Sequence, residues 1–360
     1  MSQEDQTHQD ISVRRQGRVG HITLTRAKVL NAVNRPVVDA MTAALTRWAD
    51  DPDIALVMVD ADSEKAFSAG GDLTSMYHYG KSGDFTSGNL FWRDEYRLNA
   101  LIARFPKPYV AVMDGIVMGG GVGISAHGSH RVVTEHSVVA MPECAIGLIP
   151  DVGGSYLLRR APGRLGEYFG LTGARMDGAT AIHAGFADFY VRRESLPALK
   201  QSLLDSGDIS QIESFASEPP ESEVARLESN ISRVFDAESV TGILDRLATE
   251  PGEWAQKALA SMTAASPISL LATLSTIRRA DDLNTALRNE YRFVSRVLEH
   301  GDFVEGIRAI IIDKDRSPRW RYPEIGAVPP ALLAQMASEA EGGDPSFAVT
   351  SDPVRPSHGG

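Results

Sequence analysis

The chain has 360 residues, of which 43% are hydrophobic and 23% are charged, so it is long enough to bury a large core and to form two structural units. Its formal net charge of −11 argues against sequence-independent nucleic-acid binding, which depends on Lys and Arg side chains that neutralise phosphates. No apolar stretch approaches the length of a membrane span, and the first residues, MSQEDQTHQD, lack the character of a signal or transit peptide. We therefore expect a cytoplasmic protein with neither nucleic-acid nor membrane partners.

Strand and helix patterns alternate along the first half of the chain. After a polar tail, ISVRRQGRVGHITLT predicts a hairpin, the segment that follows Pro36 an amphipathic helix, and IALVMVDA a buried strand. FSAGGDLTSM then predicts a glycine loop before a helix, and a polar patch from Gly80 to Gly88 separates it from a helix over NLFWRDEYRLNALIARF. PYVAVMDG, RVVTEH and SVVAMP predict strands, and GGSYLLRRAP and ARMDGATAIHAG predict helices. This order indicates an α/β fold.

The second half has a different pattern. From about Ser195 the strand signal disappears, SGDISQIESFASEPPES is typical of a polar connector, and helical patterns continue to about Asp313. The end of the chain is rich in Gly, Pro and Ser, which predicts poor order. We expect four parts: a polar tail over 1–10, an α/β core with the active site over 11–195, a helical region over 196–335 and a flexible tail over 336–360.

Two glycine loops, AGGD at 69–72 and GGGVG at 119–123, each follow a predicted apolar strand and precede a predicted helix. Glycine inside a helix costs about 1 kcal/mol relative to alanine, so the second loop needs a reason for its glycines. If the loops lie side by side, the N–H groups of Gly71 and Gly120 would form an oxyanion hole that contributes roughly 3 to 4 kcal/mol per donor. Two unrelated tight turns would use the same residues.

Two carboxylates follow closely. Glu143 lies behind Pro142 just after an apolar strand, and Asp151 precedes Gly153 at a strand-to-helix turn. Two acids near a glycine cleft indicate general acid/base or nucleophilic chemistry, although Asp151 would also suit the cap of the helix that starts at Gly153. Cys144, the single cysteine, is expected to face away from the cleft if Glu143 faces it.

Other motifs in the sequence give weaker evidence for a function or argue against one. G-x-G-x-x-A at Gly121, Gly123 and Ala126 is similar to a dinucleotide fingerprint, but its strand does not run directly into the first glycine and no acid follows in the ribose-binding position. No G-x-S-x-G elbow is present. One cysteine rules out an internal disulfide and a cysteine-based zinc site. Four histidines show no metal-binding spacing: His127, His130, His136 and His183.

With these motifs in order, the chain resembles the crotonase (enoyl-CoA hydratase/isomerase) superfamily, and within it the 3-hydroxyisobutyryl-CoA hydrolases. LTRAKVLNAVN, AFSAGGD, KPYVAVMDGIVMGGGVG, MPECAIGLIPDVGGSYLLRR and LTGARMDGATAIHAG follow the family order over residues 11 to about 190. DFVEGIRAIIIDKDRSPRW, from Asp302 to Trp320, resembles the C-terminal signature of the hydrolases. The resemblance implies a crotonase-like spiral of ββα units with a C-terminal helical region, and it leaves a homo-oligomer, trimer or hexamer, open.

The resemblance also implies an activity, the hydrolysis of 3-hydroxyisobutyryl-CoA to 3-hydroxyisobutyrate and CoA in valine breakdown. The first catalytic glutamate of the hydratases falls at the position of Gly123, whereas Glu143 matches their second glutamate and Asp151 matches the hydrolases. Glu143 and Asp151 would then be catalytic, and Glu95 would contact the polar end of the substrate. The N–H groups of the oxyanion hole would come from Gly71 and Gly120. The residues implied to contact coenzyme A are Lys28, Ala69, Gly70, Asp72 and Leu73.

Coenzyme A is part of that substrate, so we expect no separate cofactor. Three alternatives stay open at this point. One is a hydratase, isomerase or decarboxylase of the same fold, another is a nicotinamide-dependent oxidoreductase, and the third is an acyl-CoA-binding protein without activity.

Overall fold

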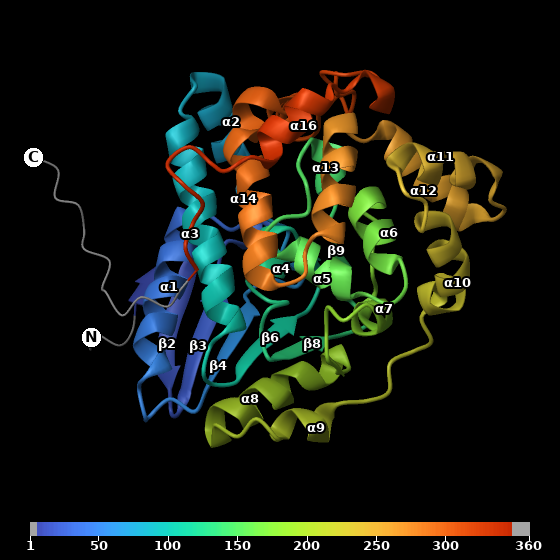
Figure 1. Ribbon diagram of the computed structural model, residues 1–360. Coiled ribbons are helices and arrows are strands. Elements are labelled where there is room, and N and C mark those ends of the chain that lie inside the picture. The colour runs from blue at the N-terminus through green and yellow to red at the C-terminus, as the bar shows by residue number, and fades with distance from the viewer. Residues whose placement is uncertain (1–5, 348–360) are drawn as a thin grey trace, which may run out of the picture.

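A computed structural model describes residues 6–347 and shows an α/β core beside a layer of helices (Figure 1). In this range the main sheet has seven strands in the order β1-β2-β3-β4-β6-β8-β10. The pairs β1–β2 and β2–β3 are antiparallel, and the pairs from β3–β4 to β8–β10 are parallel. A second sheet holds β5, β7 and β9, all parallel. The strands are β1 (Gln6–His8), β2 (Ile11–Gln16), β3 (Val19–Leu24), β4 (Leu56–Ala61), β5 (Ala66–Ser68), β6 (Tyr109–Met113), β7 (Ile116–Met118), β8 (His130–Val133), β9 (Val138–Ala140) and β10 (Phe189–Tyr190).

The predicted hairpin and buried strands are confirmed. β2 and β3 pair around a turn in which Gly17 has a φ of 58°, a conformation that glycine adopts without strain. β4 is covered on both faces, because alternate side chains of a strand point to opposite sides. Val57 and Val59 join one apolar cluster, and Leu56 and Met58 join another.

Helices of the first half follow the predicted order with one difference. α2 and α3 are separated by a break at Gly83 and Asp84, so the expected polar patch from Gly80 to Gly88 is wrong. Gly83 ends α2 with a φ of 75°, and the Asp84 carboxylate accepts a hydrogen bond from Ser87 N at 3.1 Å, which starts α3. The helices here are η1 (Ala27–Val29), α1 (Arg35–Ala49), α2 (Leu73–Ser82), α3 (Phe85–Ala103), α4 (Gly120–Gly123), η2 (Glu143–Ile146), α5 (Gly154–Arg160), α6 (Leu165–Thr172) and α7 (Gly178–His183).

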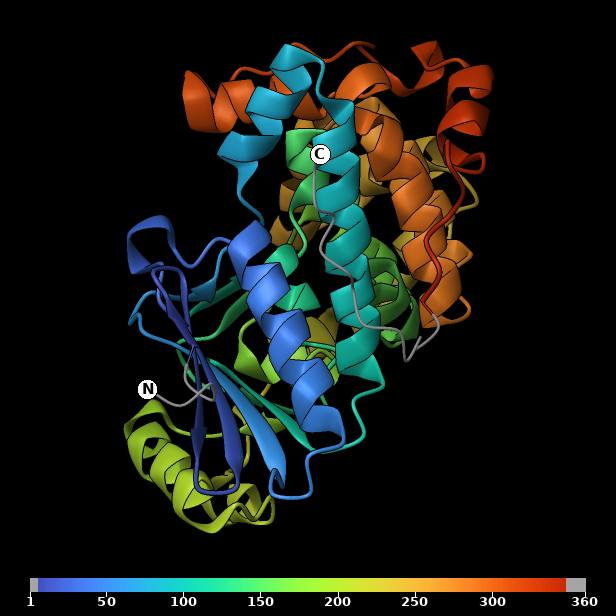
Figure 2. The same ribbon diagram turned by 90° about the vertical axis from the view of Figure 1, so that its left-hand side faces the viewer.

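The helices that follow β10 cover the back of the main sheet. η3 (Arg193–Ser195), α8 (Leu196–Ser206) and α9 (Gln211–Phe215) run below the strands in Figures 1 and 2. Leu199 and Leu203 of α8 and Ile212 of α9 pack on the cluster that contains Leu56 and Met58. The expected polar connector is therefore wrong over α9, and residues 196–215 belong to the sheet layer in space.

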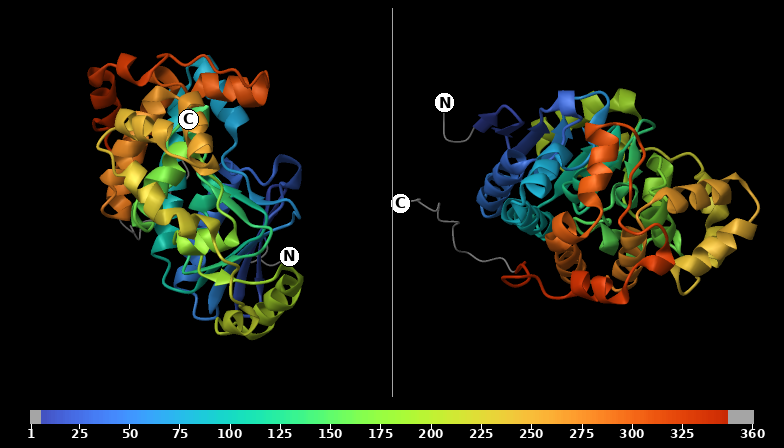
Figure 3. Two further views of the ribbon diagram at one scale, coloured as in Figure 1. Left: turned by 90° about the vertical axis from the view of Figure 1, so that its right-hand side faces the viewer. Right: turned by 90° about the horizontal axis from the view of Figure 1, so that it is seen from above.

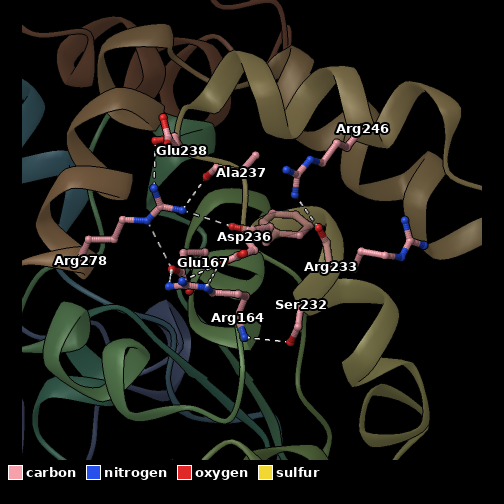
Figure 4. A network of polar contacts seen from close by, with 10 residues as sticks. Arg164, Glu167, Ser232, Arg233, Asp236, Ala237, Glu238, Arg246 and Arg278 are labelled. Carbon is pink, nitrogen blue, oxygen red and sulfur yellow. Dashed lines mark hydrogen bonds and ion pairs between the residues drawn. The ribbon is translucent and has the colours of Figure 1, made fainter.

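The remaining helices form a layer against α3, α5 and α6, with α10, α11 and α12 at one edge of the molecule (Figure 3). Arg278 of α13 binds the buried Glu167 of α6, and Arg164, next to α6, binds Asp236, which follows α10, so both pairs join this layer to the core (Figure 4). These helices are α10 (Glu223–Phe235), α11 (Val240–Thr249), α12 (Glu253–Ala264), α13 (Pro267–Arg278), α14 (Leu283–His300), α15 (Phe303–Ile307), η4 (Arg308–Ile312), η5 (Ile325–Ala327) and α16 (Pro330–Ala337).

At both ends of the described range, residues that were expected to lie in a tail are part of the fold. Residues 6–8, expected to be a tail, form β1. In the expected flexible tail, Asp344 pairs with Arg292 at 2.6 Å, and Phe347 is 6% exposed, whereas residues 1–5 and 348–360 lie outside the described range. No single helix within 6–347 is long and apolar enough to cross a membrane. Taken together, α12 and α13 have the length and composition of a membrane span, but they are bent by 116°.

Candidate active site

The second sheet brings three segments to one cavity. β5 leads into the glycine loop at 69–72, β7 into residues 119–120 and β9 into residues 142–143. Because the three strands are parallel, their carboxyl ends meet at the same edge of the sheet. The cavity between them has a volume of about 150 Å³, which is small beside common ligand pockets of about 300–1,000 Å³. β7 was not predicted from the sequence, because it is only three residues long and directly follows a turn.

The two glycine loops lie side by side, as one of the two alternatives predicts. A Cβ on Gly120 would lie 3.4 Å from Gly71 N, and a Cβ on Gly121 would clash with the carbonyl oxygen of Ser68. Gly119 has φ 47° and ψ −121°, a backbone conformation that residues with a Cβ rarely adopt. The glycines are needed for close contact between the loops.

The backbone hydrogen bonds around the two loops bear on the N–H groups of Gly71 and Gly120. Val33 N donates to Gly70 O at 2.8 Å and Asp72 N donates to Val33 O at 2.9 Å, so the N–H of Gly71 between them points away from Val33. Gly120 is the first residue of α4, and the first N–H groups of a helix have no partner inside it. Both glycines line the cavity, and their role as an oxyanion hole stays a prediction.

Three carboxyl groups line the same cavity: Glu95 of α3, Glu143 at the start of η2, and Asp151. We call them the cavity acids. They are only 2%, 4% and 4% exposed, respectively. Glu95 Oε1 and Glu143 Oε2 are buried without a hydrogen-bond partner in the described part of the chain, whereas Asp151 Oδ2 accepts a hydrogen bond of 2.8 Å from the hydroxyl of Tyr96. Two of the three acids therefore present unsatisfied oxygen atoms.

Burial changes the protonation of the cavity acids. It raises the pKa of Glu95 and of Glu143 well above the ordinary range, and repulsion from the Asp151 carboxylate raises both further. Burial also raises the pKa of Asp151 to about 7, against the opposing effect of the Tyr96 hydrogen bond. Close acids of this kind titrate as a group. Of the three, Asp151 is the acid whose pKa lies near neutral pH.

Asp151 directly precedes a left-handed turn, and its side chain does not cap α5. Gly153 occupies the cap position of that helix and contributes no side chain. Instead, Gly153 N donates to Glu290 Oε2 at 2.7 Å, and Ser155 N donates to Glu290 Oε1 at 3.0 Å. The capping alternative for Asp151 is wrong. Sequence reasoning missed Glu290 because it lies on α14, 137 positions beyond Gly153.

Aromatic side chains close the cavity from two elements. Trp92 of α3 and Phe303 of α15 line it, with ring centroids 6.1 Å apart. Phe303 and Glu290 both lie beyond residue 195, so the helical region contributes directly to a site that the sequence analysis placed within residues 11–195. The signature that begins at Asp302 is the signal that could have indicated Phe303.

Residues expected to bind coenzyme A divide into two groups. Ala69, Gly70, Asp72 and Leu73 line the cavity, and the Asp72 carboxylate also pairs with Arg26 at 3.1 Å, a cation that the sequence analysis did not single out. Lys28 is exposed in η1 and is not among the residues that line the cavity. Its proposed contact with the phosphates stays a prediction.

Cys144 points away from the cavity, as predicted. Its Sγ lies 3.2 Å from Thr273 Oγ1 and 3.4 Å from Gly170 O. Burial raises the pKa of this thiol to about 12, so the reactive thiolate is absent at neutral pH. Within residues 6–347, no group of three or more His, Cys, Asp or Glu side chains is arranged to hold a metal ion.

Comparison with known proteins identifies the family of this chain. The family model described as enoyl-CoA hydratase/isomerase matches residues 19–337. The chain belongs to this family. A chicken (Gallus gallus) protein named 3-hydroxyisobutyryl-CoA hydrolase, mitochondrial, is 38% identical over 92% of this chain and 87% of its own. The protein of the same name from Xenopus tropicalis is 39% identical over 86% of this chain and 83% of its own.

Solved structures confirm the crotonase fold and carry other names. A Rhodobacter sphaeroides structure titled as an enoyl-CoA hydratase is 45% identical, with a TM-score of 0.88 over 91% of this chain and 97% of that one. A Mycobacterium thermoresistibile structure titled as a carnitinyl-CoA dehydratase is 40% identical, with a TM-score of 0.91 over 95% of this chain and 100% of that one. Because these names differ in reaction, the residues of the cavity must decide between them.

Proposed function

We propose that this protein is a thioesterase that hydrolyses 3-hydroxyisobutyryl-CoA to 3-hydroxyisobutyrate and CoA. The observation that carries the proposal is the combination of paired amide donors with Glu143 and Asp151 in one small cavity. The names of the curated relatives from Gallus gallus and Xenopus tropicalis agree with it. In this proposal coenzyme A is part of the substrate, and no separate cofactor takes part.

In the proposed reaction, the thioester oxygen accepts hydrogen bonds from the N–H groups of Gly71 and Gly120. These donors stabilise the negative charge that develops on this oxygen when the carbonyl is attacked. Glu143, whose Oε2 lacks a partner, then acts in one of two ways. In its carboxylate form it attacks the carbonyl carbon, expels the CoA thiolate and leaves an anhydride that water opens, or it removes a proton from the attacking water.

Asp151 completes the proposed proton transfers. With a pKa of about 7, its carboxyl group can gain or lose a proton near neutral pH, which suits a group that exchanges protons with water or with the departing thiolate. The hydroxyl of Tyr96 fixes one of its oxygens. Glu95 Oε1, buried and unpaired, is the proposed acceptor for the hydroxyl at the polar end of the acyl group.

Hydration on the same fold is disfavoured at Gly123. In the resemblance to the hydratases, this position carries their first catalytic glutamate. Here a Cβ on Gly123 would lie 2.7 Å from Val152 Cβ and 2.8 Å from Asn99 Nδ2. Real Cβ atoms do not approach other atoms so closely, so the backbone of this chain has no room for a glutamate at position 123. Addition of water to a double bond would lack half of its acid/base pair.

A nicotinamide cofactor is disfavoured by the packing of the G-x-G-x-x-A motif. In dinucleotide-binding proteins these glycines let the backbone approach a pyrophosphate. Here Gly121 contacts the backbone of Ser68, and Gly123 contacts Val152 and Asn99. The glycines serve contacts within the protein.

Release of free CoA thiol from 3-hydroxyisobutyryl-CoA, measured beside hydration of crotonyl-CoA, tests the proposal. We expect thiol release without hydration. Hydration without thiol release would overturn the proposal and return the chain to the hydratases. A series of longer 3-hydroxyacyl-CoA substrates should show falling kcat/KM, because Trp92 and Phe303 close a small cavity.

A further inference from the structure

The turn that carries Asp151 has an uncommon backbone. Val152 and Gly153 have φ values of 54° and 78°, so two consecutive residues are left-handed. A β-branched residue such as Val152 rarely adopts this conformation. It persists only where surrounding contacts enforce it. Because Asp151 directly precedes the turn, the direction of its carboxyl group depends on those contacts.

Side chains from two distant elements hold this turn. Glu290 of α14, 0% exposed, accepts hydrogen bonds from Gly153 N at 2.7 Å, from Ser155 N at 3.0 Å and from the Ser155 hydroxyl. From another side, the ring of His127 lies 2.8 Å from Val152 O and donates through Nε2. Burial lowers the pKa of His127 to about 4, so this ring is neutral at working pH.

A local cap could not replace Glu290. α1 and α2 begin at Asn34 and Asp72, whose own side chains cap them. At α5 the cap position is Gly153, where a Cβ would lie 2.7 Å from both His127 Nε2 and Leu283 Cδ1. Any residue with a side chain would disturb the turn, so the acceptor must come from elsewhere in the fold.

A carboxyl group is electrostatically unfavourable at this place. Burial raises the pKa of Glu290 to about 8, and repulsion from Asp151 adds to this effect, although the hydrogen bonds from residues 153 and 155 oppose it. Glu143 and Tyr96 also face this charge. What a glutamate offers in return, in its carboxylate form, is two acceptor oxygens at a fixed separation, so that Gly153 N and Ser155 N are bound together.

We propose that Glu290 is a positioning residue of the active site, which locks the left-handed turn at Val152 and Gly153 and thereby directs the Asp151 carboxyl into the cavity. This inference rests on the proposed hydrolase function, in which Asp151 is catalytic. Glu290 itself does not line the cavity and acts through the turn.

Glu290→Gln tests the proposal in the full-length protein, with 3-hydroxyisobutyryl-CoA as the substrate. The glutamine amide has one acceptor oxygen and one donor nitrogen, so it cannot accept from Gly153 N and Ser155 N at once. We expect kcat to fall by about 10²-fold, because small misplacements of catalytic groups have effects of that size. KM should stay nearly constant, because the oxyanion donors and the loop at 69–72 are untouched.

A matched control is Glu167→Gln, which also changes a buried glutamate that joins the core to the helical layer. It should lower the melting temperature and leave kcat and KM as in the wild type. If Glu290→Gln behaves like this control, with reduced stability and normal kcat, Glu290 is only structural and the proposal is overturned. Should the glutamine variant not fold, Glu290→Asp, which keeps the charge but is shorter, is measured for the same separation of kcat from KM.

Measurements on the wild type and on Asp151→Asn distinguish failure of the proposed function from failure of the role proposed for Glu290. If the wild type releases no thiol, or if Asp151→Asn is as active as the wild type, the proposed function or the role of Asp151 is wrong. If both behave as expected while a folded Glu290 variant keeps full kcat, only the role of Glu290 is wrong.

Discussion

Two groups of buried carboxyls in this protein have opposite surroundings. Glu167, 3% exposed, lies between Arg164 at 3.0 Å and Arg278 at 3.5 Å (Figure 4). We call these side chains, with Asp236, the Glu167 network. The cavity acids are equally buried, but no ion pair to Lys or Arg involves them within residues 6–347, and repulsion between carboxyls is part of their environment. One group of charges is compensated and the other is not.

The difference indicates that the cavity acids, and not Glu167, lower the stability of the fold. Arg278 also donates to the carbonyl oxygens of Phe235, Ala237 and Glu238, so the Glu167 network is satisfied on every side. A buried charge with such partners joins elements together. A buried carboxyl without a cation instead keeps its proton to higher pH, and this is typical of catalytic groups. The comparison predicts that substitutions in the two places separate activity from stability.

The largest effect is expected for Glu143→Gln. The amide fills the same volume but can neither attack a thioester nor accept a proton from water, so kcat for thiol release should fall by about 10³-fold or more. Binding of a non-hydrolysable thioether analogue, measured by calorimetry, should change little. Loss of binding together with turnover would show that Glu143 shapes the cavity and is not a reacting group.

Gly120→Ala tests whether backbone N–H groups stabilise the negative charge in a cavity whose acids form no ion pair with Lys or Arg. The new Cβ would lie 2.9 Å from Glu95 Oε1 and 3.4 Å from Gly71 N, so it intrudes where the thioester oxygen is proposed to bind. We expect about a 10²-fold loss of kcat, the size of effect seen when one oxyanion donor is removed. Gly326→Ala is the control, because no atom lies within 4 Å of its Cβ position. Equal rates for both variants would contradict the oxyanion hole.

Glu167→Gln tests the compensated side of the comparison. It leaves Arg164 and Arg278 without their shared partner, and these arginines are partly exposed, so the free energy of unfolding should fall by about 1–3 kcal/mol. Denaturation in urea measures this loss. Turnover of the folded variant should match the wild type, and a change in kcat would show that the Glu167 network reaches the cavity.

The effect expected for the stability of Asp151→Asn depends on pH. The pKa of Asp151 rises from an ordinary value of 3.8 to about 7 on folding, so the folded state holds this proton more tightly than the unfolded state. Its contribution is fully present below about pH 4 and is lost as the pH rises to about 7. Asparagine does not titrate, so the variant should melt about 5 °C or more above the wild type at pH 8. The two should melt alike at pH 4, and an equal difference at both pH values would refute the linkage.

Local patterns account for what the sequence could predict. The apolar runs that became β4 and β6, the amphipathic α1 and the two glycine loops each carry their signal within a few residues. The same holds for Glu143 and Asp151, which directly follow such signals. Short elements were missed, because β7 and α9 have too few residues for a periodic pattern.

Contacts between distant segments account for the rest. Nothing near Glu290 in the sequence distinguishes it from a solvent-exposed acid of a helix, and its partners are 135 and 137 positions away. The same is true of Tyr96, whose partner Asp151 lies 55 positions further on. The burial that raises the pKa of the cavity acids is likewise a property of the assembled fold.

Because Glu290 of α14 binds the turn at residues 152–153, the active site is completed late during synthesis on the ribosome. Strands β1 to β10 and the segments with Glu143 and Asp151 leave the exit tunnel well before residue 290, and domains generally fold from the N-terminal side during synthesis. A nascent chain that stops before α14 therefore has its oxyanion loops but lacks the acceptor for Gly153 N and Ser155 N. If Glu290 has the role proposed for it, catalytic competence is acquired late, once the last third of the polypeptide has been made.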